Sequence, residues 1–335
     1  MQTKLLKPIL LAVLLPALVA PVNGQMKSTG AVLGRVTDPS GAVVPGAAVT
    51  LTNVGTGAVL RTQANTSGDY SFPVVPVSRY ELAVEASGFK TMVLRAISVS
   101  AVENVRLDVT LEVGQVVERV TVEAAAPPVN SVTADVGDTV NSSQIKTLPI
   151  SSRLFTQLIF LEAGVVSNNP EGGGGFGSNS IANFSLNGVR SESNNLQIDG
   201  IRNLDTFGGN AFVSPNINSL QEFRIENNSY SAATGRVAGG QVNLITKSGT
   251  NQLHGSAFEY FRNDTLNARN FFASGKPKNR YNNFGYTFGG PVKKDRVFFF
   301  WSQEWRRIIE SGGTRTAQVA TPTERDGDFS AQLPS

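Results

Sequence analysis

Short segments in the first third of the chain alternate apolar with polar residues. Val49 and Leu51, for example, alternate with threonines, which is the two-residue period of a strand with one buried face. Turn-forming pairs such as Pro45-Gly46 separate the segments. The expected strands cover residues 31–37, 48–53, 59–63, 69–73, 80–86, 91–99 and 105–111. This pattern predicts a small antiparallel β-sandwich of the all-β class over residues 28–113.

The middle of the chain mixes the periods of helices and strands. Leu154, Leu158 and Leu161 fall on one helical face, so a helix is predicted over residues 153–161, with Gly164 as its stop. Strands are expected over residues 133–140, 183–190, 194–200, 222–226 and 241–246. Residues 132–250 are therefore predicted to form an α+β domain.

Three later segments, residues 253–262, 281–289 and 296–306, have the length of membrane-crossing strands, roughly 9–11 residues. In the second, Phe284, Tyr286 and Phe288 alternate with small or polar residues. A short charged turn and a longer polar loop separate the segments, as in outer-membrane barrels. Residues 251–335 are predicted to be the first strands and outer loops of a truncated β-barrel. A second soluble sandwich is the alternative, although it explains the aromatic density less well.

The 335 residues carry 29 Lys and Arg against 26 Asp and Glu. Residues 1–24 read as a secretory signal peptide, because Lys4 and Lys7 precede an apolar run that ends near the small residue Gly24. Removing these two lysines, with no acids, leaves 27 basic against 26 acidic residues. The apolar run is shorter than the roughly 20 residues of a spanning helix, although an uncleaved anchor is the alternative. We expect an exported protein and no nucleic-acid partner.

The residues offer little chemistry for catalysis. The chain has no Cys and a single His, His254, whereas a zinc site needs several nitrogen or sulfur ligands. The glycines at 172–175 are not followed by the Gly-Lys-Ser/Thr of a phosphate-binding loop. No enzyme activity, catalytic residue, metal or cofactor is expected.

The segment 220–251 contains a strand, glycines that permit sharp bends, and a second strand. This order of strands and glycines resembles the end of the plug domain of TonB-dependent outer-membrane receptors. The matching residues are Gly235, Gly239, Gly240, Val242, Asn243, Leu244, Thr246 and Lys247. The stretch 148–165 is similar to the plug helix of a carbohydrate- or peptide-type subgroup, through Leu148, Pro149, Arg153, Phe155 and Leu158, and the pair Asp199-Gly200 also recurs there. Residues 132–250 are thereby identified as a plug domain.

Asp199 has two further interpretations. It is a metal or substrate ligand, or a carboxylate that caps a turn or pairs with an arginine, and the second is the more frequent role. The candidate partners are Arg190, Arg202, Arg224 and Arg236.

The predicted sandwich resembles the carboxypeptidase regulatory-like domain, which has a transthyretin-like, carbohydrate-binding-like fold. The resemblance rests on Gly34, Val36, Asp38, Gly41, Pro45, Gly46, Ala47, Val49, Gly68, Tyr70, Phe72, Tyr80, Gly88 and Phe89. Residues 77–79 depart from it, because the family usually has Pro-Gly before the tyrosine. The aromatic residues form either a stacking platform for carbohydrate or, as we expect, the core of the sandwich.

Residues 114–131 read as a linker that contains a β-prone stretch before an Ala/Pro-rich one. In TonB-dependent receptors an extended peptide here adds as a strand to the energy-coupling protein, mainly through backbone hydrogen bonds. Glu118, Val120, Thr121 and Val122 fit such a segment. The alternative is that these residues form the last strand of the sandwich or the first strand of the plug.

The resemblance implies the N-terminal part of a TonB-dependent receptor for energy-coupled import of a bulky solute across the outer membrane. The implied partners are a periplasmic TonB-type protein, outer-membrane lipid and a solute such as an oligosaccharide, peptide or chelate. By analogy, the substrate-side loops contain Asn168, Asn169, Phe176, Arg202 and Asn203. The alternative function is a secreted or surface carbohydrate-binding adhesion protein without transport activity.

Overall fold

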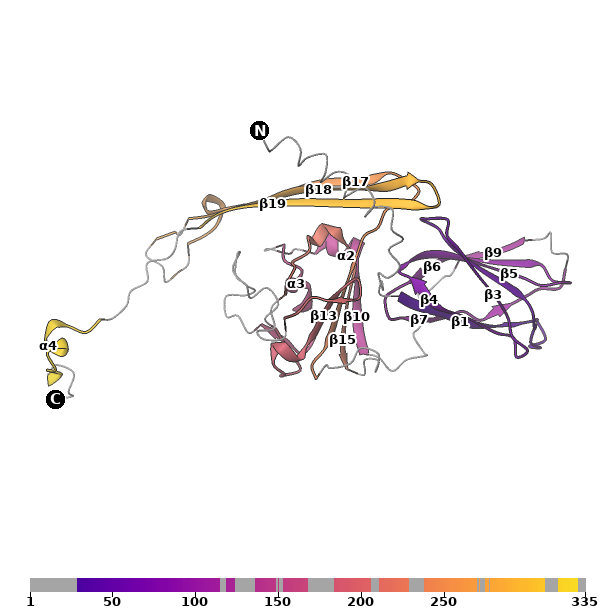
Figure 1. Cartoon of the computed structure of the whole chain (residues 1–335), viewed down its shortest axis with the longest axis horizontal. Coiled ribbons are helices and arrows are strands. Elements are labelled where there is room, and N and C mark those ends of the chain that lie inside the picture. The colour runs from indigo at the N-terminus through magenta and orange to yellow at the C-terminus, as the bar shows by residue number, and fades with distance from the viewer. Residues whose placement is uncertain are drawn as a thin grey trace, which may run out of the picture. The chain divides into compact units, whose positions relative to one another are not determined.

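The chain divides into two compact units, Met1–Ser256 with Tyr286–Gln303, and Ala257–Gly285 with Glu304–Ser335. The computed structural model describes residues 29–114, 119–123, 136–148, 150, 153–167, 184–205, 211–228, 238–269, 271, 275–276, 278–310 and 319–330. The expected signal peptide lies outside these residues. Figure 1 labels the elements, which are almost all strands.

Residues 29–123 form a β-sandwich of two sheets. Its strands are β1 (Thr29–Thr37), β2 (Ala48–Asn53), β3 (Val59–Gln63), β4 (Asp69–Pro76), β5 (Ser78–Glu85), β6 (Thr91–Val99), β7 (Asn104–Arg106), β8 (Val109–Thr110) and β9 (Arg119–Glu123). One sheet has the order β4-β1-β7, with β8 also paired to β1, and the other has the order β3-β2-β5-β6-β9. Six of the seven segments expected from alternation are thus strands, and the seventh, residues 105–111, is split into β7 and β8. The sandwich is not purely antiparallel as expected, because β7 and β8 pair with β1 in parallel and the additional strand β9 pairs with β6 in parallel.

The alternating residues of the sandwich meet in one hydrophobic core. Leu51 and Leu82 are directly paired between β2 and β5, and both are fully buried. Tyr70 and Tyr80 are also buried, and their hydroxyls donate to the backbone oxygens of Leu107 and Pro76 at 2.6 and 2.7 Å. A buried Tyr usually finds such a partner for its hydroxyl. These aromatics therefore belong to the core, as expected, and do not form a stacking platform.

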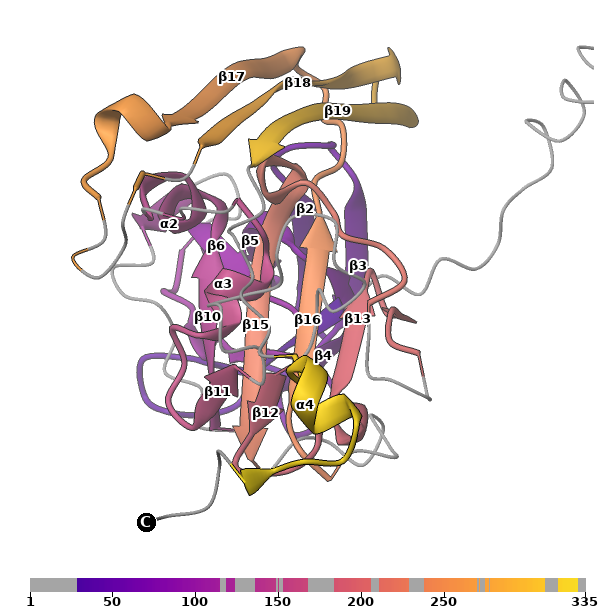
Figure 2. The ribbon, with the colours of Figure 1, turned by 90° about the vertical axis from the view of Figure 1, so that its left-hand side faces the viewer.

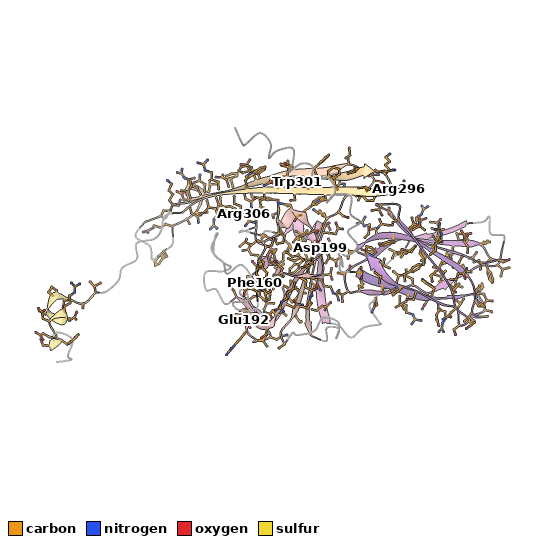
Figure 3. The ribbon with its side chains drawn as sticks, viewed as in Figure 1. Phe160, Glu192, Asp199, Arg296, Trp301 and Arg306 are labelled. Carbon is orange, nitrogen blue, oxygen red and sulfur yellow. The ribbon has the colours of Figure 1, made fainter. Side chains whose placement is uncertain are left out.

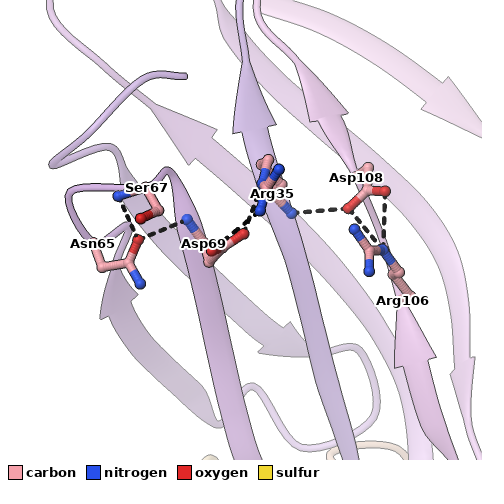
Figure 4. Close-up of polar contacts among 6 residues, drawn as sticks. All are labelled: Arg35, Asn65, Ser67, Asp69, Arg106 and Asp108. Carbon is pink, nitrogen blue, oxygen red and sulfur yellow. Dashed lines mark hydrogen bonds and ion pairs between the residues drawn. The ribbon is translucent and has the colours of Figure 1, made fainter. Parts of the chain in front are cut away.

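A row of alternating charges crosses the surface of the sandwich (Figure 4). Arg35 on β1 forms an ion pair with Asp69 on β4 at 2.8 Å, and its backbone N–H donates to Asp108 at 2.9 Å. Arg106 pairs with Asp108 at 3.0 Å. The hydrogen bond from Arg35 holds the pKa of Asp69 below its usual value. Because these side chains are exposed, the pairs contribute little to stability.

Residues 136–246 form an α+β region. Its main sheet has the order β10-β15-β16-β13-β14, and β11 pairs with β12 separately. The strands are β10 (Val136–Asn141), β11 (Val165–Ser167), β12 (Phe184–Leu186), β13 (Asn195–Ile198), β14 (Ile201–Arg202), β15 (Leu220–Asn228) and β16 (Gln241–Thr246). The helices are α2 (Ser142–Thr147) and α3 (Thr156–Ile159), with 3₁₀ turns η1 (Ser191–Ser193) and η2 (Ile217–Ser219). In Figure 2, α3 lies in front of β10 and β15, and α2 lies at the upper left, near the upper end of β10.

The apolar face of the main sheet forms the core of this region. Phe223 and Ile225 on β15 are paired with Leu244 and Val242 on β16, and all four are buried. They share a hydrophobic cluster with Leu158 on α3 and with α2. Strands are present in each expected segment, but two are shorter than expected: residues 183–190 contain only β12, and residues 194–200 contain β13, which ends at Ile198 before a turn. β10 begins at Val136, and residues 133–135 and 183 lie outside the description.

The helix expected over residues 153–161 is wrong in extent, because α3 covers only four residues. Arg153 has a φ of +54°, a left-handed conformation that a regular helix does not continue through. The leucine stripe reflects burial around a short turn rather than a longer helix. The unexpected helix α2 begins with a capping box, in which the side chains of Asn141 and Gln144 each accept from the other's backbone N–H.

A three-stranded sheet with the order β17-β18-β19 follows. Its strands are β17 (His254–Asn263), β18 (Asn279–Lys293) and β19 (Val297–Glu310), with the 3₁₀ turn η4 (Asp264–Leu266) between β17 and β18. A short helix, α4 (Pro322–Arg325), begins after its cap Thr321. Within the described parts of the chain, no helix has the length and apolar character needed to cross a membrane.

Gly34 lets two segments of the sandwich approach closely. A Cβ atom at this position would lie 1.8 Å from the backbone oxygen of Leu107 and 2.9 Å from the hydroxyl of Tyr70. We predict that Gly34→Ala destabilises the sandwich by about 3 kcal/mol through overpacking. Urea denaturation with pulse proteolysis of the sandwich would measure this loss.

Gly41→Ala is the matched control for this prediction. Gly41 has a φ of +86°, but a Cβ atom at this position would have no neighbouring atom within 4 Å. Its substitution tests conformational strain alone and is expected to cost about 1 kcal/mol. A loss for Gly34→Ala no larger than that for Gly41→Ala would contradict the close approach.

Candidate functional site

The pair Asp199-Gly200 forms the two-residue turn between β13 and β14. Both residues have positive φ, +50° and +83°, as an Asp-Gly hairpin turn requires. The Asp199 carboxylate accepts from the backbone N–H of Thr246 at 2.9 Å and from its hydroxyl at 2.6 Å. Figure 3 labels Asp199. The carboxylate therefore bonds to the end of β16 rather than to its own turn, and Arg236, one of the candidate partners, lies outside the described residues.

The glycines of the plug-like motif lie at the opposite end of β16. A Cβ at Gly239 would meet Asn194 Oδ1 at 2.1 Å, and one at Gly240 would meet Leu186 Cδ1 at 2.4 Å. Asn194 also donates to the backbone oxygen of Phe184 at 2.8 Å. The glycines are therefore required by close packing. Gly235, from the same motif, lies outside the described residues.

Arg153 and Lys247, 94 positions apart in the sequence, meet at Asn218. Arg153 Nη2 donates to Asn218 Oδ1 at 3.0 Å, and Lys247 Nζ donates to the Asn218 backbone oxygen at 2.7 Å. Burial and, to a smaller extent, the nearby charge of Lys146 lower the pKa of Lys247 to about 8. The arrangement brings two motif residues to one backbone segment and ties the end of β16 to η2.

The second face of the main sheet is polar yet buried, and includes Asn243 from the motif. Arg224 Nε pairs with Glu226 Oε1 at 2.9 Å, and the two side chains are 7% and 0% exposed. Gln241 Nε2 donates to Asn243 Oδ1 at 2.7 Å. Arg224 and Glu226 are paired across the sheet with Asn243 and Gln241. Sequence reasoning missed this cluster, although polar residues at every second position of β15 are its signal.

Glu222 lies on the same strand face and is 5% exposed. The backbone N–H of Ala101 donates to its Oε1 at 2.9 Å. Burial raises the pKa of Glu222 from 4.5 to about 7, and this hydrogen bond opposes the rise. Glu222 is therefore a carboxyl group that changes charge near neutral pH.

The candidate coupling segment coincides with β9. Val120, Thr121 and Val122 are paired in parallel with Met92, Val93 and Leu94 of β6. The structure thus describes the alternative in which these residues form the last strand of the sandwich. Glu118 lies outside the described residues, and the coupling role itself stays a prediction.

The candidate substrate-side residues are only partly described. Asn168, Asn169 and Phe176 lie outside the description. Arg202 is exposed on β14. Asn203 is buried, where its side chain donates to the backbone oxygen of Val213 at 2.7 Å and accepts from the Val213 N–H at 2.9 Å. Asn203 thus holds a loop together and is a poor candidate for contacting solute.

Large apolar side chains cover one face of β18 and β19. Phe284, Tyr286 and Phe288 are 42–45% exposed, and Trp301 and Trp305 on β19 are 56% and 45% exposed (Trp301 is labelled in Figure 3). This confirms the alternation expected for β18. Exposed apolar area of this density marks a surface that contacts lipid or another apolar partner.

The opposite face of these strands carries polar residues. Asn283 is fully buried and its amide donates to Tyr281 Oη at 3.0 Å and to Glu304 Oε1 at 3.2 Å. Nearer the turn between β18 and β19, Ser256 and Thr287 hydroxyls are 2.8 Å apart. One apolar and one polar face per strand is the pattern of a membrane barrel wall. Among the described residues, no group of three or more His, Cys, Asp or Glu side chains is placed to hold a metal.

Comparison with known proteins assigns both ends of the chain. Residues 31–112 match the carboxypeptidase regulatory-like domain, and residues 245–335 match the outer membrane beta barrel domain. The TonB-dependent transporter Oar of Myxococcus xanthus is 32% identical over an aligned length of 259 residues, and the match covers 70% of this chain. The chain is homologous to the TonB-dependent transporters. It spans 22% of the length of that relative.

The match to the outer membrane beta barrel domain and the homology to Oar support an outer-membrane location for this chain. Among solved structures, the siderophore receptor PirA of Acinetobacter baumannii is 18% identical with a TM-score of 0.39, over 51% of this chain and 24% of that one. A catechol 1,2-dioxygenase of Acinetobacter radioresistens is 14% identical with a TM-score of 0.23, over 29% of this chain and 58% of that one. Neither likeness is close enough to bear on function.

The raised pKa of Glu222 predicts a pH-dependent stability. The folded state binds the proton of the Glu222 carboxyl group more tightly than the unfolded state does. The stabilisation that this proton provides is therefore full below pH 4.5 and is lost as the pH rises through about 7. Glu222→Gln keeps the neutral form at every pH. For each pH, the free energy of unfolding of the variant is compared with that of the wild type. We predict that this difference is about 3 kcal/mol more favourable to the variant at pH 8 than at pH 4.

Urea denaturation at a series of pH values would measure this difference. Glu85→Gln serves as the control, because Glu85 is an exposed carboxylate in the same compact unit. An equal pH dependence in the wild type and in Glu222→Gln would contradict the burial of Glu222 as a proton-binding group.

Proposed function

We propose that this chain is the N-terminal part of a TonB-dependent receptor that imports a bulky solute with energy supplied from the periplasmic side. The observation that carries the proposal is the homology to a TonB-dependent transporter over 70% of the chain. An oligosaccharide, a peptide and a chelate are the solute classes considered. No described feature favours the carbohydrate-binding adhesion alternative, since Tyr70, Phe72 and Tyr80 are buried.

Each region has a proposed role. The sandwich is a transthyretin-like domain on the periplasmic side, and residues 132–250 are the plug that closes the lumen. Support for the plug comes from the packing of its motif glycines and from the contact between Asp199 and Thr246. In this mechanism, solute binds above the plug, the coupling segment is pulled from below, and the plug shifts to open a path.

Residues 251–335 are proposed to begin the barrel wall. The exposed aromatic face of β18 and β19 would contact lipid, and the face that carries Asn283 and Thr287 would point to the lumen. Three strands leave two unpaired edges, which the hydrocarbon core does not tolerate. Further strands are therefore required to close the barrel in which this sheet takes part.

Energy coupling is proposed to use residues 118–122. An extended peptide binds by adding a strand, so its affinity comes mainly from backbone N–H and C=O groups. Val120 and Thr121 already have the extended conformation that such pairing needs. The periplasmic partner is proposed to be a TonB-type protein.

Trp301→Asp tests the lipid-facing assignment. A charge on the lipid face of a barrel costs about 2–4 kcal/mol near the bilayer midplane. We predict that the full-length receptor with this change reaches the folded, heat-modifiable form in the outer membrane at a clearly reduced level. Membrane fractionation with unheated gel electrophoresis would measure it.

Ser302→Asp is the matched control on the opposite face of β19. Ser302 is half-buried, and the amide of Asn216 donates to its hydroxyl at 3.3 Å, so a carboxylate there can also accept. This variant is expected to assemble nearly as the wild type does. Equal losses for both variants would argue against a lipid-facing Trp301.

Thr121→Pro tests the coupling segment, because proline removes a backbone N–H and fixes φ. The expected result is loss of site-specific cross-linking to the periplasmic coupling protein, with outer-membrane assembly unchanged. Ala126→Pro, in the neighbouring Ala/Pro-rich stretch, is the control and should cross-link normally. Normal cross-linking of Thr121→Pro would remove this segment from the proposed mechanism.

A further inference from the structure

The strand β9 closes one edge of the sandwich although it lies beyond the matched domain. The carboxypeptidase regulatory-like match ends at residue 112, and β9 begins at Arg119. In the sheet order β3-β2-β5-β6-β9 it is the outermost strand, and β6 is its neighbour. The described buried residues of the sandwich core come from β1 to β8, from the loops between these strands and from Leu111 just after β8.

The pairing places the candidate coupling segment in register on β6. Thr91 to Arg95 pair in parallel with Arg119 to Glu123, residue by residue. Val120 is half-buried opposite Met92, which packs against the sandwich core, and Thr121 is exposed. The pairing with β6 uses backbone groups of the segment, and a strand-adding partner would also use backbone groups.

A strand has two hydrogen-bonding edges, and β6 occupies one edge of β9. A partner that needs that edge must displace β6, whereas a partner on the outer edge need not. β9 is short, and parallel pairing is slightly weaker per residue than antiparallel pairing. The small net gain of each backbone hydrogen bond is further opposed by the entropy cost of ordering the strand. Such a strand is suited to exchange.

We propose that β6 is the resting partner of the coupling segment, and that a strand of the periplasmic energy-coupling protein replaces β6 when the receptor is engaged. The inference rests on the proposed function and names its regulation. The sandwich then acts as a competitor that keeps the segment paired until the coupling protein binds. A partner that adds to the outer edge of β9 is the contrary outcome.

A disulfide between β6 and β9 tests this exchange directly. The chain contains no cysteine, so Met92→Cys with Val120→Cys introduces a single defined pair at directly opposed positions. Thr50→Cys with Arg61→Cys joins β2 to β3 at the other end of the same sheet and serves as the matched control. The probe is the purified periplasmic domain of the TonB-type protein from the same bacterium, added to the full-length receptor extracted from outer membranes in detergent.

We expect the oxidised β6–β9 pair to bind the probe at least tenfold more weakly than the reduced pair, with binding restored by dithiothreitol. The oxidised control pair should bind as the wild type does. Equal binding by the oxidised and reduced β6–β9 pair would overturn the exchange and leave energy coupling standing. Failure of the disulfide to form would overturn the resting pairing alone. Absence of binding by every form, wild type included, would overturn the proposed coupling together with the exchange.

Discussion

The pairing of β15 with β16 is the constraint on which the central region depends. Its register sends Phe223 and Ile225 into the apolar core and leaves Arg224 and Glu226 on the opposite face. A slip of one residue would exchange the two faces and bury charges among leucines. The buried ion pair does not itself guarantee stability, because removing two charges from water is costly. Its effect is to make the wrong register far less favourable than the right one.

The motif residues that resemble a plug domain lie at the two ends of β16, one strand of this pair. At the start of β16, Gly239 and Gly240 leave room for Asn194 and Leu186. At its end, Thr246 is bound by Asp199, and the following lysine reaches the backbone of η2. The motif therefore describes the two ends of one strand and the neighbours that fix it. This arrangement explains why glycine and short polar residues occur together in one short stretch.

Alternation predicted most of the strands because a strand with one buried face has apolar residues at every second position. Val49 and Leu51 follow it, as do the aromatic residues of β18. The helix over residues 153–161 was overestimated, since a compact buried turn and a helical stripe place leucines at similar spacings. Helix α2 was missed because it is short and polar, although Asn141 and Gln144 carry the signal of its capping box.

The local sequence pattern could not predict contacts between residues that are far apart in the chain. Asp199 and Thr246 are 47 residues apart, and only the hairpin turn beside the end of β16 brings them together. The buried environment of Glu222 depends in the same way on Ala101, 121 residues earlier. The stretch around Val120 was recognisable as β-prone, but its neighbour was not, because parallel edge pairing leaves no turn signal between the strands.

The lengths of the two connections to β9 decide how tension would spread after the proposed exchange. Between Gly114 and β9 lie residues 115–118, and between β9 and β10 lie residues 124–135. Fully extended, four residues reach about 14 Å and twelve reach about 40 Å. A partner that holds β9 therefore cannot move farther than about 14 Å from Gly114 through the shorter connection without moving the sandwich.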